Sequence, residues 1–353
     1  MPADPEQGGL SYRDAGVDRE ATSAAKRFIG EVVRRTHGPE VLSRVGGFGG
    51  IFRAPAEGAG AALVASADGV GTKLRVARMA GIHDTVGQDL VNHCVDDILV
   101  EGARPLFFLD YIGMGQLAPG VIEALVLGMA DACRLNGCAL LGGETAQMPD
   151  FYGADEYDLA GFIVGVAPAE PERRPGSHRV RSGDVLVGLA SNGFHTNGYS
   201  LLRHLFFDRL GWTLDTELPD VGKPLGEVLL TVHRSYLGPL LPLVEAGRVR
   251  ALAHITGGGI PENLARVIPD ELQARVQRST WAIPGEFEAV MRLGDVAEDE
   301  MYRTFNMGVG MILVVSPEDE LDVVERLRAA GEDAWGLGIV QARHPGETAV
   351  KLL

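Results

Sequence analysis

The stretch ASADGVGTKL (residues 65–74) brings an acidic residue, two glycines and a lysine into one short loop. Asp68 follows a predicted strand over 61–67, and Gly69 and Gly71 offer backbone N–H groups that no Cβ shields from an anion. Lys73 adds a positive charge suited to a phosphate. The spacing matches neither the P-loop, G-x-x-x-x-G-K-[ST], nor the dinucleotide loop, G-x-G-x-x-G. By spacing alone, the loop is a weak indication of phosphate binding.

Further carboxylates lie in or directly after other predicted elements. Asp96 and Asp97 lie in a predicted helix over 84–102, and Glu144 follows a predicted strand over 138–141. Mg²⁺ prefers one or two carboxylates together with phosphate oxygens and water. Each acidic residue alone is more readily a cap or a solvated charge. Because they occur together with glycine loops, convergence on a Mg²⁺ site is the better hypothesis.

The loop SNGFHTNG (191–198) places His195 between Asn192 and Asn197, directly after a predicted strand over 184–190. Histidine can act as acid, base or phosphate donor near neutral pH. A lone histidine is more often structural. We expect this loop to be exposed, and its two amides and two glycines favour a functional role.

A second glycine loop, TGGG, lies between a predicted strand over 251–255 and a helix that has Pro261 in its first turn. Free amides at a helix N-terminus form a natural anion site, although a tight turn explains the loop about equally well. The candidate anion-binding residues here are Thr256, Gly257, Gly258 and Gly259.

The remaining histidines and the three cysteines show no metal-site spacing. His93 and Cys94 are neighbours in sequence, but on a helix they point about 100° apart and are poor partners for one metal. Buried apolar packing is the better interpretation of Cys94, Cys133 and Cys138.

Strands and helices alternate in both halves of the chain, which predicts two α/β-layered domains. With 353 residues, the chain is too long for one ordinary core. The polar stretch PAEPERRPGSHR (168–179) suits an exposed linker, so we place the domains at 1–168 and 169–353.

The composition bounds the function. The net charge of −16 argues against a nucleic-acid surface, and no apolar run is long enough to span a membrane. The N-terminus lacks the order of a signal peptide, so we expect a cytoplasmic protein. The 47 glycines sit in clusters between apolar runs, as expected for tight turns or close backbone approach to a ligand.

Taken in order, the motifs resemble the phosphoribosylformylglycinamidine cyclo-ligase (aminoimidazole ribonucleotide synthetase) family from about residue 11 to the C-terminus. DGVGTK is shared with a wider superfamily that includes selenophosphate synthetase and thiamine-monophosphate kinase, whereas LFFLDY, ITGGG and RTFNMGVGM together point to the cyclo-ligases. The matching stretches are SYRDAGVD (11–18), GGFGG (46–50), DGVGTKL (68–74), DDILVEGARPLFFLDY (96–111), GGETAQMPDFY (142–152), YDLAGFIVG (157–165), SNGFHTNGYSL (191–201), HITGGGIPENLARVIP (254–269) and EMYRTFNMGVGM (300–311).

The resemblance implies an α+β fold of two domains. The N-terminal domain would be a four-stranded sheet with helices that binds ATP and closes a barrel across a homodimer. The C-terminal domain would be an α/β half-barrel that completes the active-site cleft. The implied reaction uses ATP and Mg²⁺ to cyclise formylglycinamidine ribonucleotide to aminoimidazole ribonucleotide, through a phosphorylated amide oxygen, with ADP and phosphate as the other products.

The resemblance also implies site residues. Asp68 and Asp97 would be Mg²⁺ ligands, and Glu144 would join them at the nucleotide. His195, Lys73, Asn197 and Asp68 would carry the chemistry, with Asn192 and Thr256–Gly259 on the substrate. The loop that would contact ATP phosphates consists of Gly69, Val70, Gly71, Thr72 and Lys73.

The chain departs from the family pattern at several positions. Asp96 stands where the family usually has asparagine, Gln147 where it has glutamate, and Asn192-Gly193-Phe194-His195-Thr196 where it has Ser-Gly-Pro-His-Ser. Many members carry a lysine near the nucleotide where this chain has Gly30, one helical turn after Lys26.

Two alternatives remain at this stage. One is another ATP-dependent superfamily member; the chain lacks a cysteine before Cys94, which disfavours selenophosphate synthetase. The other is a non-catalytic nucleotide-binding scaffold, which the retained Asp68, Lys73, Asp97 and His195 disfavour.

Overall fold

The structure, a computed structural model, describes residues 39–43, 50–54 and 60–353. The motif at 11–18, Lys26, Gly30 and residues 46–49 of GGFGG lie outside these ranges, and the expectations attached to them stay predictions.

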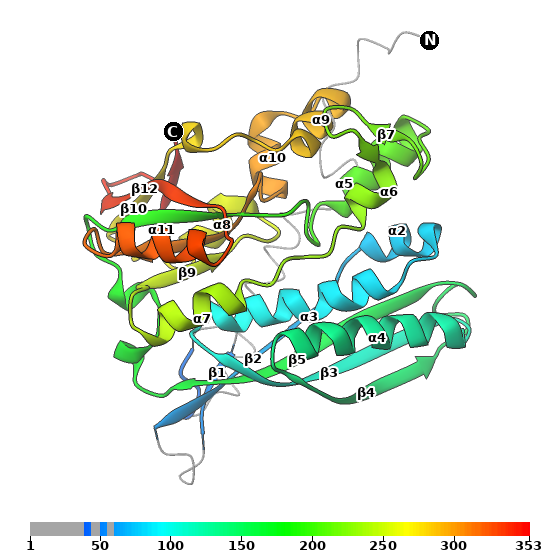
Figure 1. Cartoon of the computed structure of the whole chain (residues 1–353), viewed down its shortest axis with the longest axis horizontal. Coiled ribbons are helices and arrows are strands. Elements are labelled where there is room, and N and C mark those ends of the chain that lie inside the picture. The colour runs from blue at the N-terminus through cyan, green and yellow to red at the C-terminus, as the bar shows by residue number, and fades with distance from the viewer. Residues whose placement is uncertain (1–38, 44–49, 55–59) are drawn as a thin grey trace.

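The first domain is a twisted sheet covered by helices on one face (Figure 1). Its strand order is β1-β2-β5-β3-β4, and only β3 and β4 run parallel. The resemblance implies four strands; the structure adds the short β1 at one edge, paired with β2. The elements are β1 (Gly50–Arg53), β2 (Ala61–Asp68), α2 (Lys73–Ala80), α3 (Asp84–Leu99), β3 (Arg104–Met114), α4 (Pro119–Leu135), β4 (Ala139–Gln147) and β5 (Tyr157–Pro168).

Helix α3 packs along this sheet as its sequence predicts. Leu90, Cys94 and Ile98 recur every four residues, form one stripe and are fully buried. Gly161 on β5 makes the close approach possible, because a Cβ there would run into the ring of Phe108 and the side chain of Leu90. Helices α3 and α4 therefore lie tightly against one face of the sheet, which places the C-terminal end of β2 beside α3.

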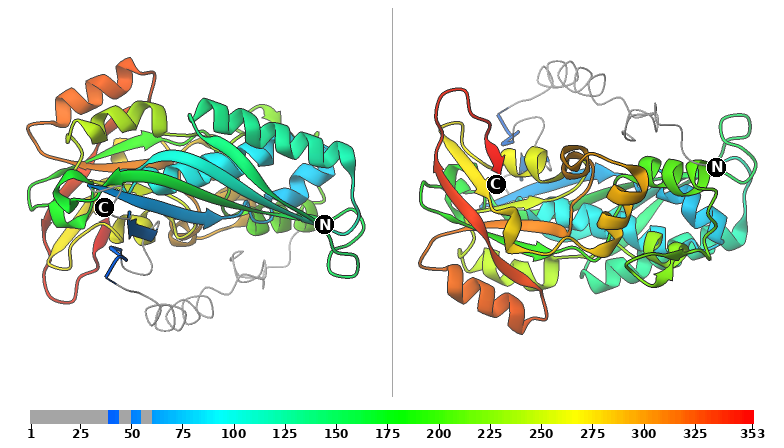
Figure 2. Two further views of the ribbon diagram at one scale, coloured as in Figure 1. Left: turned by 90° about the horizontal axis from the view of Figure 1, so that it is seen from below. Right: turned by 90° about the horizontal axis from the view of Figure 1, so that it is seen from above.

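The second domain contains a six-stranded mixed sheet with the order β13-β10-β12-β6-β11-β9. Strand β11, between β6 and the edge strand β9, is buried at all seven positions, and α11 packs outside the sheet (Figure 2). The strands are β6 (Val185–Ala190), β9 (Ala251–His254), β10 (Leu272–Val276), β11 (Val309–Val315), β12 (Ala334–Ala342) and β13 (Val350–Leu352), with a small hairpin of β7 (Glu217–Leu218) and β8 (Lys223–Pro224). The helices are α5 (Tyr199–Arg203), α6 (Leu225–Leu229), α7 (Leu237–Glu245), α8 (Gly259–Ala265), α9 (Gly285–Gly294), α10 (Glu298–Thr304) and α11 (Glu320–Ala329).

The α+β class and the two layered sheets confirm the expected fold class. The predicted helix over 199–207 is only partly regular: α5 ends at Arg203 and continues as a π-helical turn, His204–Arg209. The first sheet uses strands up to Pro168 and the second begins at Val185, with two short 3₁₀ turns between them. The division at 168/169 itself stays a prediction.

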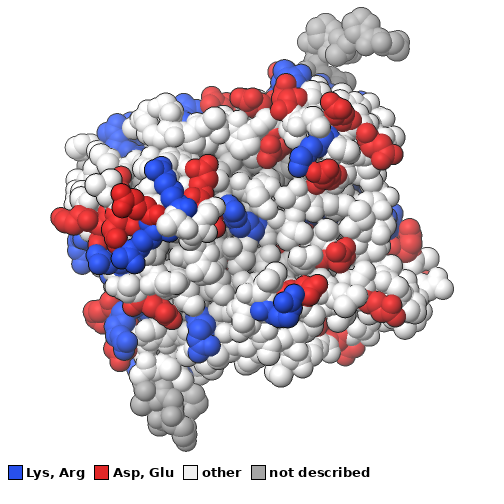
Figure 3. All heavy atoms as spheres, in the orientation of Figure 1, with Lys and Arg blue, Asp and Glu red and all other residues white. Residues whose placement is uncertain are grey.

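Charged side chains of both signs are interspersed on the face shown in Figure 3, around a largely uncharged centre. No helix within residues 39–43, 50–54 and 60–353 is both long and apolar enough to cross a membrane.

Candidate active site

The polar face of α3 joins the two domains. The backbone N–H of His233 donates to Asp89 Oδ1 at 2.6 Å, and that of Tyr236 donates to Asp96 Oδ1 at 2.8 Å. Asn92 Nδ2 donates to the His233 carbonyl at 2.7 Å. We call this contact of α3 with residues 231–237 the α3 seam. It positions every candidate residue on α3 against the C-terminal domain.

The α3 seam also accounts for Asp96, one of the departures from the family pattern. Its side chain is fully buried and accepts the Tyr236 N–H rather than facing a ligand. Burial raises the pKa of this carboxyl group well above its usual range. Asp96 therefore adds less negative charge to the site than the Asp96-Asp97 sequence suggests.

Lys73 begins α2 and is completely buried. Its ammonium group lies 2.7 Å from Asp89 Oδ2 and donates to the carbonyls of Thr231 (2.7 Å) and His195 (3.1 Å). The sequence predicts an ammonium group that faces a phosphate. The structure gives it three protein partners instead, because the first turn of α2 points it into the seam. The phosphate contact stays a prediction, and the visible role of Lys73 is to fasten the two domains.

Asp68 and Asp97 are neighbours, as the Mg²⁺ hypothesis requires. His93 Nε2 lies 2.9 Å from Asp68 Oδ2 and 3.8 Å from Asp97 Oδ2, so one imidazole edge touches both carboxylates. His254 Nδ1 bonds Asp97 Oδ1 at 2.9 Å. Asp97 is buried, whereas the Asp68 side chain is 45% exposed. The pair thus has one anchored and one accessible carboxylate.

Electrostatics hold the Asp68 carboxyl group in its ionised state. Burial alone would raise the pKa of Asp68, but the charge and hydrogen bond of His93 and the Gly69 amide outweigh it and hold the pKa at about 2. Burial alone would lower the pKa of His93, but Asp68, followed by Asp97 and Asp96, raises it to about 9. Near neutral pH, a cationic imidazole therefore lies between the two carboxylates.

The glycine loop after Asp68 turns toward a cavity. The Gly69 amide donates to Asp68 Oδ1 at 2.7 Å, which closes the turn, while the side chain of Val70 is buried. Gly71 and Thr72 line a cavity of about 350 Å³. Its other lining residues include Leu74, Arg75, Arg78, Tyr152, Glu156, Tyr157 and Asp158. Two arginines thus lie near the loop where the sequence predicts phosphate binding.

Glu144 does not join the other carboxylates within this chain. It lies on the edge strand β4 opposite Tyr111, and β5 and β3 separate β4 from β2. At about 4.8 Å per strand, this sets Glu144 about 14 Å from Asp68 along the sheet. Within this chain the strand order therefore does not bring Glu144 to Asp68 and Asp97, and its role at the nucleotide stays a prediction.

The loop 191–198 is buried from Gly193 to Thr196, which corrects the expectation of an exposed loop, while Asn192 is exposed. His195 is 1% exposed and has a left-handed backbone with φ of +58°. Its Nε2 lies 3.0 Å from Asn192 Oδ1, and Asn192 Nδ2 donates to the Val232 carbonyl at 2.8 Å. The amide oxygen only accepts, so this 3.0 Å contact favours a proton on Nε2 over the longer 3.5 Å approach of the Asn192 backbone N–H. His195 Nδ1 has no hydrogen-bond partner.

The TGGG loop lies beside loop 191–198. A Cβ on Gly257 would lie 3.1 Å from the Asn197 side-chain oxygen, so the two candidate substrate loops touch. The side chain of Asn263 holds the turn by donating to the carbonyls of Thr256 and Gly259, at 3.3 and 2.8 Å. The contact between the two loops follows from the fold and is not indicated by their sequences.

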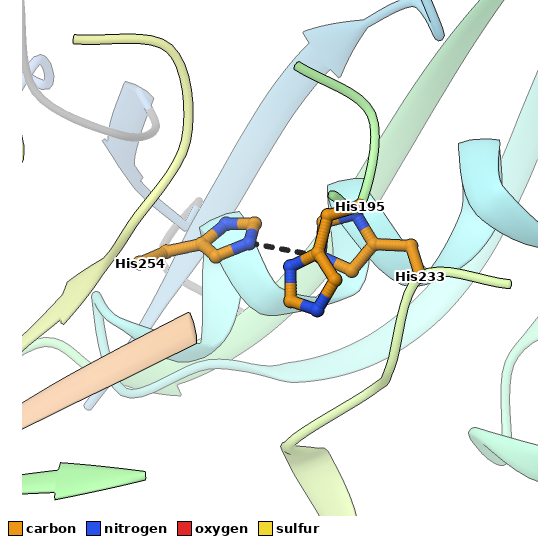
Figure 4. A group of neighbouring side chains, drawn as sticks. All are labelled: His195, His233 and His254. Atoms are coloured by element: carbon orange, nitrogen blue, oxygen red, sulfur yellow. Dashed lines mark hydrogen bonds between the residues drawn. The ribbon is translucent and has the colours of Figure 1, made fainter. Parts of the chain in front are cut away.

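Four histidines meet at this point, although their sequence positions show no metal spacing. His93 comes from α3, His195 from loop 191–198, His233 from the α3 seam and His254 from the end of β9. The rings of His195 and His233 stack with centroids 4.0 Å apart, and His233 Nε2 lies 3.1 Å from His254 Nε2 (Figure 4). Burial holds the pKa values of His195 and His233 well below their usual range. The sequence carries no local signal for this cluster.

Comparisons with known proteins agree with this architecture. The family models described as AIR synthase related protein, N-terminal domain and C-terminal domain, match residues 49–167 and 181–351. A phosphoribosylformylglycinamidine cyclo-ligase of Desulfitobacterium hafniense is 48% identical over 339 residues, which cover 96% of this chain and 98% of the relative.

Solved structures extend the likeness in fold. Protein tt0281 from Thermus thermophilus superposes with a TM-score of 0.65 at 22% identity, covering 94% of this chain and 95% of the other. Thiamine-monophosphate kinase from Stenotrophomonas maltophilia has a TM-score of 0.59 at 17% identity, covering 91% and 93%. Both AIR synthase domain models and a near full-length relative at 48% identity match, so the chain belongs to the AIR synthase related family, among the phosphoribosylformylglycinamidine cyclo-ligases.

Proposed function

We propose that this chain catalyses the ATP-dependent cyclisation of formylglycinamidine ribonucleotide to 5-aminoimidazole ribonucleotide, with ADP and phosphate as products, in purine biosynthesis. The observation that carries the proposal is the 48% identity to a cyclo-ligase over 96% of the chain. The kinase alternative has less support, because the likeness to thiamine-monophosphate kinase is at 17% identity and concerns the fold alone.

The chemistry requires a better leaving group than an amide oxygen. The γ-phosphoryl group of ATP passes to the formyl oxygen, the amidine nitrogen attacks the formyl carbon, and phosphate leaves with that oxygen as the ring closes and a proton is lost. Resonance makes an unactivated amide carbon a poor electrophile. The protein must therefore position the two reactants and neutralise phosphate charge during transfer.

Asp68 and Asp97 fit a Mg²⁺ ion by their donor chemistry. Both offer the hard carboxylate oxygens that Mg²⁺ prefers. The Asp68 carboxylate is partly exposed, and the Asp97 carboxylate is anchored by His254. Bound Mg²⁺ would screen the phosphate charge. Gly71, Thr72, Arg75 and Arg78 line the adjoining cavity, where both arginines pair with Glu156 at 3.7 and 3.5 Å, and this lining supports nucleotide binding there.

The loops at 191–198 and 256–259 supply the proposed substrate side. Asn192 fixes the His195 ring so that Nδ1 keeps a free lone pair, the state a general base needs. Asn197 and the backbone of Thr256–Gly259 border it. A wild-type pH–rate profile in His195→Ala would contradict the acid–base role.

We also propose a homodimer. Odd-numbered residues of β5 face the helices, whereas Phe162 on the other face is 45% exposed. Leu141 on the edge strand β4 is exposed as well. Within residues 39–43, 50–54 and 60–353 no helix covers this sheet face, and its large apolar side chains support packing against a second copy.

The direct test incubates purified protein with Mg–ATP and formylglycinamidine ribonucleotide and follows aminoimidazole ribonucleotide. We expect Asp68→Asn to lose most activity and to need more Mg²⁺ while remaining folded, and Asp131→Asn on the exposed side of α4 to behave as wild type. Turnover of thiamine monophosphate without cyclo-ligase activity would overturn the proposal.

A further inference from the structure

Three buried imidazoles direct ring nitrogens at one point. His195, His233 and His254 are at most 1% exposed, and the candidate ligand atoms they offer lie within 4.8 Å of one another. Figure 4 shows the three rings converging from three separate backbone segments. One of these nitrogens, His195 Nδ1, is buried without a partner, and an unpaired buried polar atom is costly.

The opposite nitrogen of each ring is held by a protein oxygen. His195 Nε2–H donates to Asn192 Oδ1, and His254 Nδ1 faces Asp97 Oδ1 at 2.9 Å. His233 Nδ1 lies 3.4 Å from Thr196 Oγ1. His195 Nδ1 then presents a free lone pair, and His233 Nε2 and His254 Nε2 share one proton in a 3.1 Å hydrogen bond that a cation would replace. This is the arrangement by which proteins fix the tautomer and orientation of metal-binding histidines.

We propose that His195, His233 and His254 form a binding site for a divalent transition metal of the zinc class. Two observations carry the proposal. His195 Nδ1 is buried without any partner. The His233 and His254 Nε2 atoms form a hydrogen bond at 3.1 Å, and this separation is close to the roughly 3.3 Å expected between two imidazole nitrogens on tetrahedral Zn²⁺ with Zn–N bonds of about 2.0–2.1 Å.

A second group, His93, Asp97 and His254, shares one ring but is a weaker candidate. Both His93 nitrogens already have partners: Nε2 lies 2.9 Å from Asp68 Oδ2, and Nδ1 lies 2.8 Å from Thr196 Oγ1. Its carboxylate oxygens also suit a hard ion such as Mg²⁺ better than the all-imidazole set does. By ligand chemistry, we therefore expect the zinc-class metal at the three imidazoles and Mg²⁺ at the adjacent carboxylates.

The site has a consequence for catalysis. Three protein ligands leave the fourth tetrahedral position open for water or another ligand. A metal held there uses the lone pair of His195 Nδ1, which the proposed reaction would use as a base. Occupancy is therefore expected to lower turnover, and removal of the metal is expected to restore it.

The test titrates chelator-treated, full-length protein with Co²⁺ in excess Mg²⁺, with hours of incubation because the rings are buried. We expect one equivalent of Co²⁺ with the visible d–d absorption of a tetrahedral site, displaced by Zn²⁺. His233→Gln and His254→Gln should weaken binding by on the order of 100-fold or more. His93→Gln, Asp68→Asn and the exposed His178→Gln should retain the band.

The absence of a saturable tetrahedral band in the wild type would overturn the site. So would loss of the band in His93→Gln or Asp68→Asn but not in His233→Gln, because that pattern belongs to the carboxylate group. X-ray absorption of the Zn²⁺-loaded wild type requires no variant to fold. Three imidazole nitrogens are expected, and a shell of oxygens alone refutes the proposal.

Discussion

Replacing Lys73 with methionine separates the structural role of this residue from a phosphate-binding role. Lys73 and Asp89 are both fully buried, with Nζ and Oδ2 2.7 Å apart. Methionine keeps most of the side-chain volume but leaves the Asp89 carboxylate without its cation, and it removes the donor to the carbonyls of His195 and Thr231. Breaking a buried ion pair by removing one partner costs about 3–5 kcal/mol. We expect the free energy of unfolding to fall by that amount.

The assay is urea-induced unfolding followed by tryptophan fluorescence. All three tryptophans, Trp212, Trp281 and Trp335, lie in the C-terminal domain, so the signal reports on the part that Lys73 fastens to α3. Lys223→Met is the matched control, because this lysine forms an exposed pair with Glu227 and its loss should leave the unfolding transition unchanged.

The double variant Lys73→Met/Asp89→Leu sharpens the test. Removing both charges replaces the pair by apolar groups, and such replacements are often neutral or stabilising for a buried pair. We expect it to recover part of the stability lost in the single variant. If Lys73→Met unfolds like the wild type while its KM for ATP rises, the ammonium group binds phosphate and the reasoning from the seam is wrong.

Three further predictions follow from other sites. The folded pKa of His93, about 9, exceeds its ordinary value of 6.5, so the stability that protonated His93 contributes is complete below pH 6.5 and is lost as the pH rises toward 9. In urea titrations without divalent ions, the difference in unfolding free energy between wild type and His93→Gln should therefore shrink by about 3 kcal/mol over this range. A constant difference would contradict this prediction. Phe162→Glu should convert a dimer to a monomer in light scattering, whereas an unchanged mass would exclude the uncovered sheet face as the interface. Gly259→Ala should destabilise by about 1–3 kcal/mol more than Gly222→Ala, because both have positive φ but only at Gly259 would a Cβ meet the Tyr302 carbonyl; equal melting curves would contradict this.

Local sequence patterns predict the helices and strands well, because the periodicity of apolar residues depends only on neighbouring positions in the chain. The spacing of Leu90, Cys94 and Ile98 defines α3, and the predicted helix over 84–102 corresponds to Asp84–Leu99. The predicted strand over 61–67 corresponds to β2, Ala61–Asp68. The adjacency of Asp68 and Asp97 follows from packing α3 against β2, so two of the expected carboxylates do meet.

The remaining features depend on contacts between distant segments. Nothing near Lys73 indicates that its ammonium group will be buried against residue 231, and the strand order that separates Glu144 from Asp68 has no local code. His195, His233 and His254 come from distant segments of the second domain, and the docking of α3 adds His93 beside His233 and His254. Single-sequence reasoning finds the loops at the site but not the orientation of their side chains.

The polar character of the α3 seam also bears on the order of events during synthesis. The N-terminal domain leaves the ribosome first, and exposed apolar surface at that stage favours aggregation. The groups of α3 that await residues 231–237 include Asp89, Asn92 and Asp96, all of which water can satisfy. The apolar stripe of α3 is already covered by its own sheet. On its α3 side, the first half of the chain therefore presents polar rather than apolar groups until its second half arrives.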